Sequence, residues 1–284
     1  MGKHKSKPDN GSKNDQAQGK QKAKLCIGVE TEAPLAVTKW NEDTKQHDLL
    51  DGGRALRELA RLFNSIGLHA YASALDTERD HSKWGITIDT SIEVGNELEG
   101  IGTPIEIKSP PMTIDLLSYM DMFRAMWGII EPLKVPSIEY WKLASTHIHF
   151  SLEGLPSFPM DLAQKLAFCI VYFEKPIDEL IPTMTDASDR KRPGGWRYCT
   201  RRNHNIELKY WKWNFKGLNY KTIEFRHMPP ARSAQETLDW ITFTSDFVAA
   251  TAKVDRVRLD MAADRQISFT EAFGFSLGDP REEQ

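Results

Sequence analysis

Cysteine and long hydrophobic runs are both scarce in this chain of 284 residues. Its three cysteines are isolated and odd in number, which argues against a disulfide framework and against a zinc module. No apolar run approaches the roughly 20 residues of a membrane-spanning helix, and no secretory signal peptide is recognisable. We therefore expect a reduced, intracellular protein of the cytoplasm. With 40% hydrophobic residues, the chain can bury the core of one large domain.

Several signatures of catalysis and nucleotide binding are also missing. The chain contains neither G-x-x-x-x-G-K-[ST] nor G-x-G-x-x-G, the loops whose backbone amides hold phosphate groups. It also lacks the H-E-x-x-H motif of many zinc proteases. If the protein binds a nucleotide, metal ions and arginine side chains must hold its phosphates instead.

The charge of the chain is unevenly distributed. Residues 1–24 contain seven lysines and two aspartates but no aromatic residue, valine, isoleucine or leucine. This composition predicts a disordered, solubilising basic tail, followed by a single folded domain in residues 25–284. Met1–Ser6 also fits the short pattern for N-terminal myristoylation, so lipid anchoring and membrane contact through the tail are the alternative. We expect no nucleic acid as a partner.

Periodic patterns predict a mixture of strands and helices after the tail. Alternating side chains predict strands at Lys24–Leu35, Trp84–Ile88, Pro104–Ser109, Ser145–Leu152, Ile206–Phe215 and Lys221–His227. Apolar residues at helical spacing predict helices at Gly53–Ile66, Thr113–Ile130, Asp161–Ile181 and Ala234–Lys253. Because the elements do not alternate strictly, we predict an α+β fold with an antiparallel sheet.

Four pairs of charged residues lie within these strands, with one residue between the two members of each pair. The pairs are Glu30 and Glu32, Glu106 and Lys108, His147 and His149, and Glu224 and Arg226. Residues two apart on a strand point to the same face, and the apolar residues around them would face a core. If the four strands share a sheet, its other face carries four glutamates, two histidines, a lysine and an arginine. Such a face is costly without bound cations.

Paired carboxylates are suitable ligands for hard divalent cations. The four glutamates could hold two or more Mg²⁺ ions, and either histidine would add a nitrogen ligand that also suits Mn²⁺. Two such ions would neutralise both the carboxylates and the phosphates of ATP. Arg226 and a run of further arginines could bind the phosphates from the other side, because guanidinium groups are planar and bidentate. That run consists of Arg190, Arg192, Arg197, Arg201 and Arg202.

The same residues leave two other functions open. His147, His149 and one glutamate could bind a single Zn²⁺ or Fe²⁺ in a hydrolase or an oxygenase. Alternatively, the protein could bind nucleotides without catalysing a reaction. A transition metal that survives dialysis would favour the first alternative, and ATP binding without turnover would favour the second.

The order of these motifs resembles that of the amidoligases, a branch of the carboxylate–amine ligase superfamily that includes glutamine synthetase and glutamate–cysteine ligase. The motifs are Gly28–Glu32, Asp89–Ile92, Ile105–Pro110, Thr146–Phe150 and Thr222–His227, with Asn214 and Trp240. Together they cover roughly residues 25–252. The resemblance implies a curved, mainly antiparallel sheet with flanking helices, like the catalytic domain of glutamine synthetase, with the site on the concave face.

The resemblance also implies a reaction. ATP would phosphorylate a carboxylate on a small molecule or a peptide, and an amine would then displace the phosphate to form an amide. By analogy with glutamine synthetase, Glu30, His147 and Glu224 would hold one metal ion. Glu32 and Glu106 would hold a second ion, nearer to the carboxylate substrate.

Three further residues receive roles from the resemblance. Arg226 would stabilise the transferred phosphoryl group, and Asp89 would orient the amine or accept its proton. His149 would contact a nucleotide phosphate or support a metal ligand. The chain departs from the family pattern around the last motif, where Lys221 and Thr222 replace the usual Gly-Thr and a proline-rich stretch, residues 228–231, replaces a glycine-rich turn.

Overall fold

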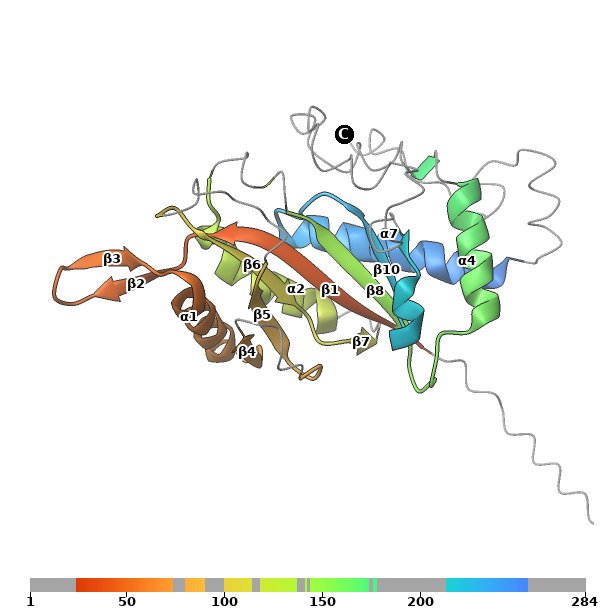
Figure 1. Cartoon of the computed structure of the whole chain (residues 1–284), viewed down its shortest axis with the longest axis horizontal. Coiled ribbons are helices and arrows are strands. Elements are labelled where there is room, and N and C mark those ends of the chain that lie inside the picture. Colours follow the sequence, from red (N-terminus) through yellow and green to blue (C-terminus); the bar gives the residue numbers. More distant parts are fainter. Residues whose placement is uncertain are drawn as a thin grey trace, which may run out of the picture.

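The structure is a computed structural model that describes residues 24–73, 80–89, 100–113, 118–136, 141, 144–173, 176–177 and 213–254. Apart from Lys24, the expected basic tail lies outside this part of the chain. The same is true of the arginines in residues 190–202. Figure 1 shows the described elements, which form a twisted sheet with helices packed along it.

One eight-stranded sheet forms the centre of the described fold. Seven strands follow the order β4 (Ala70–Ser73), β5 (Trp84–Ile88), β6 (Thr103–Lys108), β1 (Leu25–Leu35), β8 (Thr146–Leu152), β10 (Ile223–Met228) and β9 (Trp213–Asn214). The eighth, β7 (Met112–Thr113), pairs with the beginning of β1. Neighbouring strands are antiparallel except β4 and β5, which run parallel. The predicted α+β class with a mainly antiparallel sheet is therefore confirmed.

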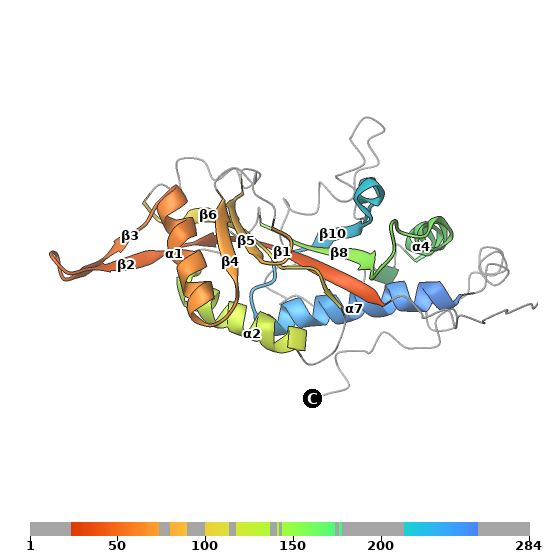
Figure 2. The same cartoon turned by 90° about the horizontal axis from the view of Figure 1, so that it is seen from below.

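The described α-helices pack beside and beneath this sheet. They are α1 (Gly52–Ser65), α2 (Ser118–Ile130), α4 (Met160–Tyr172) and α7 (Ala234–Lys253). In Figure 2, α2 and α7 follow one another along the same side of the sheet, while α1 lies beside β4. Helix α4 packs against α7 at the other end of the molecule.

Apolar residues on one face of the central strands form the core with the helices. Val29 of β1, Ile148 of β8 and Phe225 of β10 are at most 2% exposed. The indole ring of Trp213 contacts both Phe225 and Phe247, and so joins β10 to α7. Because side chains alternate along a strand, burying these residues directs their charged neighbours to the opposite face.

Helix α7 has the boundaries that the sequence predicts. The Ser233 hydroxyl accepts a hydrogen bond from the backbone N–H of Glu236, which caps the first turn. One turn further on, Thr237 Oγ1 accepts a buried hydrogen bond of 2.9 Å from Trp127 Nε1 of α2. This contact fixes the two helices to each other beneath the sheet.

Three predicted boundaries are wrong. Thr113 was expected to open a helix but belongs to β7, because it pairs with Cys26 of β1. Phe215 was expected in a strand, but β9 ends at Asn214 and Phe215 leads into the 3-10 helix η5 (Lys216–Tyr220). Helix α4 ends at Tyr172 and not at the predicted Ile181, although the sequence also predicts that Pro176, which has no N–H to donate, kinks or ends the helix, and α4 does end before this proline. Residues 114–117, 178–181 and 206–212 lie outside the described residues.

Several small elements were not predicted. Strand β4 adds the parallel edge, and a hairpin of β2 (Thr38–Asn41) and β3 (Gln46–Leu49) forms a separate two-stranded sheet that projects from the body in Figure 1. A short 3-10 helix, η2 (Glu131–Leu133), follows α2. Within the described residues, none of the helices combines the length and the apolar character needed to cross a membrane.

Candidate metal centre

The strand register places the four charged pairs side by side on the sheet. Glu30 of β1 lies between Lys108 of β6 and His147 of β8. Two residues further along β1, Glu32 lies opposite Glu106 of β6. Toward the other end of the strands, His149 of β8 lies opposite Glu224 of β10. The prediction that the strands share one sheet is therefore confirmed.

Three of these side chains come close enough to share a cation. His149 Nε2 lies 3.3 Å from Glu30 Oε1 and 3.8 Å from Glu224 Oε1. One ligand atom from each of the three residues lies within 4.8 Å of the others, and the described residues contain no other such group of three. The Nε2 atom of His149 is buried and lies near both carboxylates without a well-oriented hydrogen bond to either.

His147 lies beneath this group and is only 3% exposed. Its Nδ1 atom is 3.3 Å from Glu30 Oε2 and 3.4 Å from Glu224 Oε1, and its Nε2 atom is 2.7 Å from the Ser145 hydroxyl. Both ring nitrogens thus have protein partners. In this arrangement His147 supports the two carboxylates from below, whereas His149 completes the group that could hold an ion.

Glu224 has two further partners on the sheet. Asn214 of the edge strand β9 donates a hydrogen bond of 2.8 Å from Nδ2 to Glu224 Oε2. The Arg226 guanidinium donates to Glu224 Oε1 in a partly buried ion pair. The carboxylate of Glu224 is therefore held from both sides, and Arg226 brings a permanent positive charge to the edge of the group.

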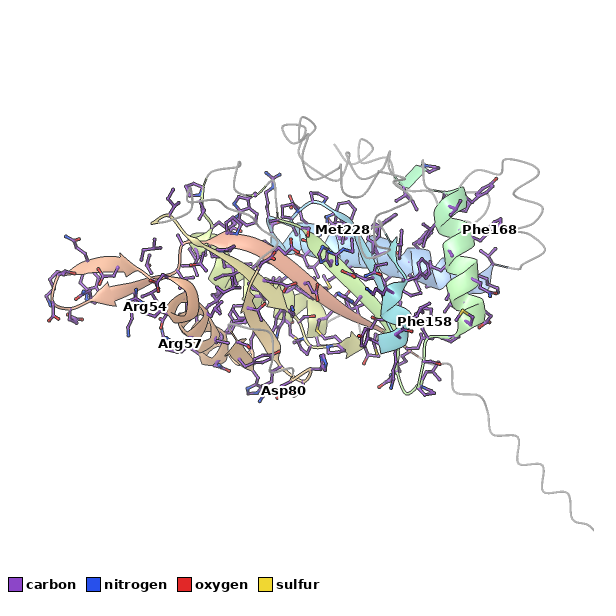
Figure 3. All side chains as sticks on the ribbon, in the orientation of Figure 1. Arg54, Arg57, Asp80, Phe158, Phe168 and Met228 are labelled. Atoms are coloured by element: carbon purple, nitrogen blue, oxygen red, sulfur yellow. The ribbon has the colours of Figure 1, made fainter. Side chains whose placement is uncertain are left out.

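A β-bulge lies next to Arg226. Phe225 pairs with Ile148, and Met228, labelled in Figure 3, pairs with Thr146, so β10 has two residues where β8 has one. Arg226 is the first of those two. Bulges often redirect a side chain beside a functional site, and here the bulge begins at the residue that carries the guanidinium.

Further along the same face, Glu32 and Glu106 contact different partners. Ser145 donates a hydrogen bond of 2.6 Å to Glu32 Oε2. Glu106 Oε2 accepts a hydrogen bond of 3.3 Å from Thr87 and lies 3.0 Å from the ammonium group of Lys108. The two glutamates expected to hold a second metal ion are thus adjacent strand partners, each bound by protein groups.

Asp89 lies at the end of β5, on the same side of the sheet as these glutamates. Its backbone N–H donates to Pro104 O, and strand alternation places its carboxyl on the face of Thr87 and Glu106. The side chain is only 7% exposed, and its charge adds to the effect of burial that raises the pKa of Glu32. The structure therefore brings Asp89 close to the glutamates, as its predicted role requires.

Burial and mutual repulsion set the protonation of the glutamates. Burial raises the pKa of Glu32. Burial, followed by the negative charge of Glu30, raises the pKa of Glu106 to about 7, although Lys108 opposes this shift. Burial also acts to raise the pKa of Glu30, but the charge of His149 and the contact with His147 outweigh it, so that pKa lies well below its usual value.

For the two histidines, burial and the neighbouring carboxylates shift the pKa in opposite directions. Burial acts to lower the pKa of each imidazole, yet the pKa of His147 and that of His149 are both raised, because Glu30 lies within contact distance of both rings. Without a metal ion, protons on the imidazoles thus help to balance the crowded carboxylates. A bound cation would take over that balancing charge.

Most of the predicted site residues are brought together, and two contributing residues were missed. Glu30, Glu32, Glu106, His147, His149, Glu224, Arg226 and Asp89 all belong to one face, whereas Arg190, Arg192, Arg197, Arg201 and Arg202 lie outside the described residues. The missed residues are the hydroxyl donors Ser145 and Thr87. Ser145 precedes His147 by two positions and Thr87 precedes Asp89 by two, so strand alternation was a signal that could have identified both.

Comparisons with known proteins do not assign the chain to a family. No protein-family model matches the sequence, and a search of curated proteins finds no significant relative.

Proposed function

We propose that this protein is an ATP- and divalent-metal-dependent carboxylate–amine ligase of the amidoligase type, with a sheet like that of glutamine synthetase. One observation carries the proposal. Glu30, His149 and Glu224, on three neighbouring strands, direct ligand atoms to one point, and Arg226 contacts the same Glu224 carboxylate. A cation site beside a fixed guanidinium is what an enzyme needs to bind and transfer a phosphoryl group.

The residues present fit Mg²⁺ or Mn²⁺. Two carboxylates and one imidazole supply oxygen donors together with a nitrogen that suits Mn²⁺. The buried Nε2 atom of His149, which makes no well-formed hydrogen bond, is an atom that a cation would satisfy. When bound, the ion would neutralise phosphate oxygens and polarise the transferred group.

The reaction has two steps that balance without another reactant. A substrate carboxylate oxygen attacks the terminal phosphorus of ATP, which breaks the bond to ADP and forms an acyl phosphate. The amine then attacks the acyl carbon, loses a proton and releases inorganic phosphate. In this scheme Arg226 stabilises the phosphoryl group in transit, and Asp89, on the same face near Glu32, orients the amine and takes its proton.

The contacts of His147 weigh against the alternative of a single-metal hydrolase or oxygenase. That reading needs both histidines as ligands of one ion, but His147 Nε2 lies 2.7 Å from the Ser145 hydroxyl and its Nδ1 lies 3.3 Å from Glu30. A histidine held on both ring nitrogens serves better as a support that orients the ligands.

Hydroxylamine trapping tests the proposal. Protein supplied with ATP, Mg²⁺, hydroxylamine and a panel of amino acids and peptides should release ADP and form an acyl hydroxamate with the correct carboxylate. Glu30→Gln should abolish both products, because it removes one charge of the cation site. Glu42→Gln, in the projecting hairpin, is the matched control and should keep full activity.

Each other outcome contradicts either the proposed site or the proposed reaction. Hydroxamate formation that survives Glu30→Gln would show that the reaction occurs elsewhere. ATP binding without turnover across the panel would favour a non-catalytic protein. A stoichiometric transition metal that remains after dialysis, without ADP release, would favour the hydrolase or oxygenase.

A further inference from the structure

Lys108 lies on the charged face but has no role in the proposed reaction. It is the strand partner of Glu30 on one side and of Gly85 on the other. Its ammonium nitrogen lies 3.0 Å from Glu106 Oε2, and its side chain is only 25% exposed. The lysine therefore places a fixed positive charge among the glutamates that were expected to hold a second ion.

The stem of Lys108 is confined by its neighbours on the sheet. Tyr71 of β4 covers Gly85, because a Cβ atom added to that glycine would lie 3.0 Å from the tyrosine hydroxyl oxygen and 3.6 Å from the Cβ of Lys108. The tyrosine ring thus occupies the space beside the lysine on the β5 side. This packing leaves the ammonium group on the side of Glu106.

The carboxylates near Lys108 are arranged unlike those of the first site. Glu32 accepts a hydrogen bond from Ser145, while Glu106 accepts one from Thr87 and pairs with the ammonium group. Among the described residues, the only three ligand atoms that gather within 4.8 Å belong to Glu30, His149 and Glu224. A second cation near Glu106 would have to displace the lysine, and repulsion between the two positive charges opposes this.

We propose that the protein alone holds one divalent cation, at Glu30, His149 and Glu224, and that the Lys108 ammonium group stands in for a second cation beside Glu106. The proposal rests on the cation site of the proposed function but does not require ligase activity. The lysine places its positive charge 3.0 Å from Glu106 Oε2, where a second cation would otherwise have to lie.

Counting bound Mn²⁺ in the absence of nucleotide tests this directly. Protein stripped with a chelator and then dialysed is titrated with Mn²⁺, and the free ion is followed by electron paramagnetic resonance. The wild-type chain should bind one ion, and His149→Ala should lose it. Lys108→Met should bind two, because removal of the ammonium group opens Glu106 and Glu32 to a second ion. Lys108→Arg, which keeps the charge, is the matched control and should bind one.

Each other count overturns the proposal. Two Mn²⁺ ions bound to the wild-type chain would show that the lysine does not exclude a second cation. If no ion binds, Glu30, His149 and Glu224 do not form a cation site. One ion on Lys108→Met would show that the lysine does not block a site. If Lys108→Met does not fold, as judged by circular dichroism, Lys108→Gln replaces it with the same expected count of two. Because the titration contains no ATP, its failure is distinguishable from a failure of ligase activity.

Discussion

Asn214 shows how a neutral side chain can control the candidate cation site. Its amide donates to Glu224 Oε2 and its carbonyl accepts the backbone N–H of Lys216, so the carboxylate is tied to the start of η5. Removal of this support should let Glu224 rotate away from His149. We therefore expect Asn214→Ala to weaken Mn²⁺ binding by about 10–100-fold, the usual effect of losing a group that orients a metal ligand.

Asn41→Ala is the matched control for Asn214→Ala. Asn41 also donates an amide hydrogen bond to a carboxylate, Asp48, but on the projecting hairpin. Its Mn²⁺ affinity should equal that of the wild-type chain in the same titration. Equal affinity of the Asn214→Ala variant would instead show that Glu224 needs no such support.

Glu106 predicts how stability depends on pH when no metal is present. Its pKa is about 7 in the folded protein and near the ordinary 4.5 in the unfolded chain. Between these values the folded state binds more protons at Glu106 than the unfolded state does, so this residue's contribution to stability falls as pH rises from 4.5 to 7. Above pH 7 the loss is complete.

Urea unfolding in the presence of a chelator, at several pH values, measures this contribution. The free energy of unfolding of the wild-type chain should fall relative to that of Glu106→Gln as pH rises through this window, because the amide does not titrate. A constant difference between the two proteins from pH 4.5 to 7 would be evidence against the raised pKa of Glu106.

At the scale of elements, the joint between α2 and α7 supports the whole charged face from below. It depends on the buried hydrogen bond from Trp127 to Thr237. Thr237→Val keeps the shape of the side chain but leaves the indole N–H without its acceptor, which should cost about 1–3 kcal/mol in the free energy of unfolding. Urea denaturation provides the measurement.

Thr244→Val tests whether the effect is specific to that joint. The buried Thr244 hydroxyl donates to Trp240 O and Ile241 O within the same helix, so its loss should cost less than the loss of Thr237. If both variants lose the same stability, the contact between the two helices contributes nothing beyond the local helix.

Long elements with a clear period could be predicted from the sequence, and short ones could not. Strands β1, β8 and β10 alternate over six or more residues, and α7 combines a serine cap with a long apolar stripe. Strand β4 has only four residues and gains its definition from pairing with β5. Thr113 likewise becomes a strand residue through its partner Cys26, which no local pattern reveals.

Strand alternation could also predict which residues share the face of the site, but not the role of each residue on that face. It places His147 and His149 on one side equally. The contacts of the two imidazoles decide which of them can bind a cation. Ser145 and Glu30 contact the two ring nitrogens of the buried His147, while the Nε2 atom of His149 is left without a well-formed hydrogen bond. Such differences arise from the twist and packing of the whole sheet.

At the scale of the whole molecule, the candidate cation site should couple metal binding to folding. Only the folded chain brings Glu30 and Glu224 together with His149, since they belong to strands far apart in sequence. A cation present at about 100 times its dissociation constant should therefore stabilise the fold by about 2.7 kcal/mol. Mn²⁺ should raise the melting temperature, and a chelator should reverse the rise.

His149→Ala provides the comparison for this melting experiment. It removes one ligand while leaving both carboxylates, so Mn²⁺ should shift its melting temperature much less than that of the wild-type chain. The same shift in both proteins would mean that the ion stabilises the fold from another position.

Because one face of the sheet is charged and the other is apolar, the odd or even position of a residue in a central strand decides which face its side chain reaches. In β1 the even-numbered residues Glu30 and Glu32 reach the site, and the odd-numbered Ile27 and Val29 reach the core. Inserting one residue into this strand would exchange the two sets and drive carboxylates into the apolar layer. Unless a bulge like the one beside Arg226 absorbs the extra residue, the strands can gain or lose residues only in twos. The loops between them are free of this constraint, so changes of length in this protein should be confined mainly to loops.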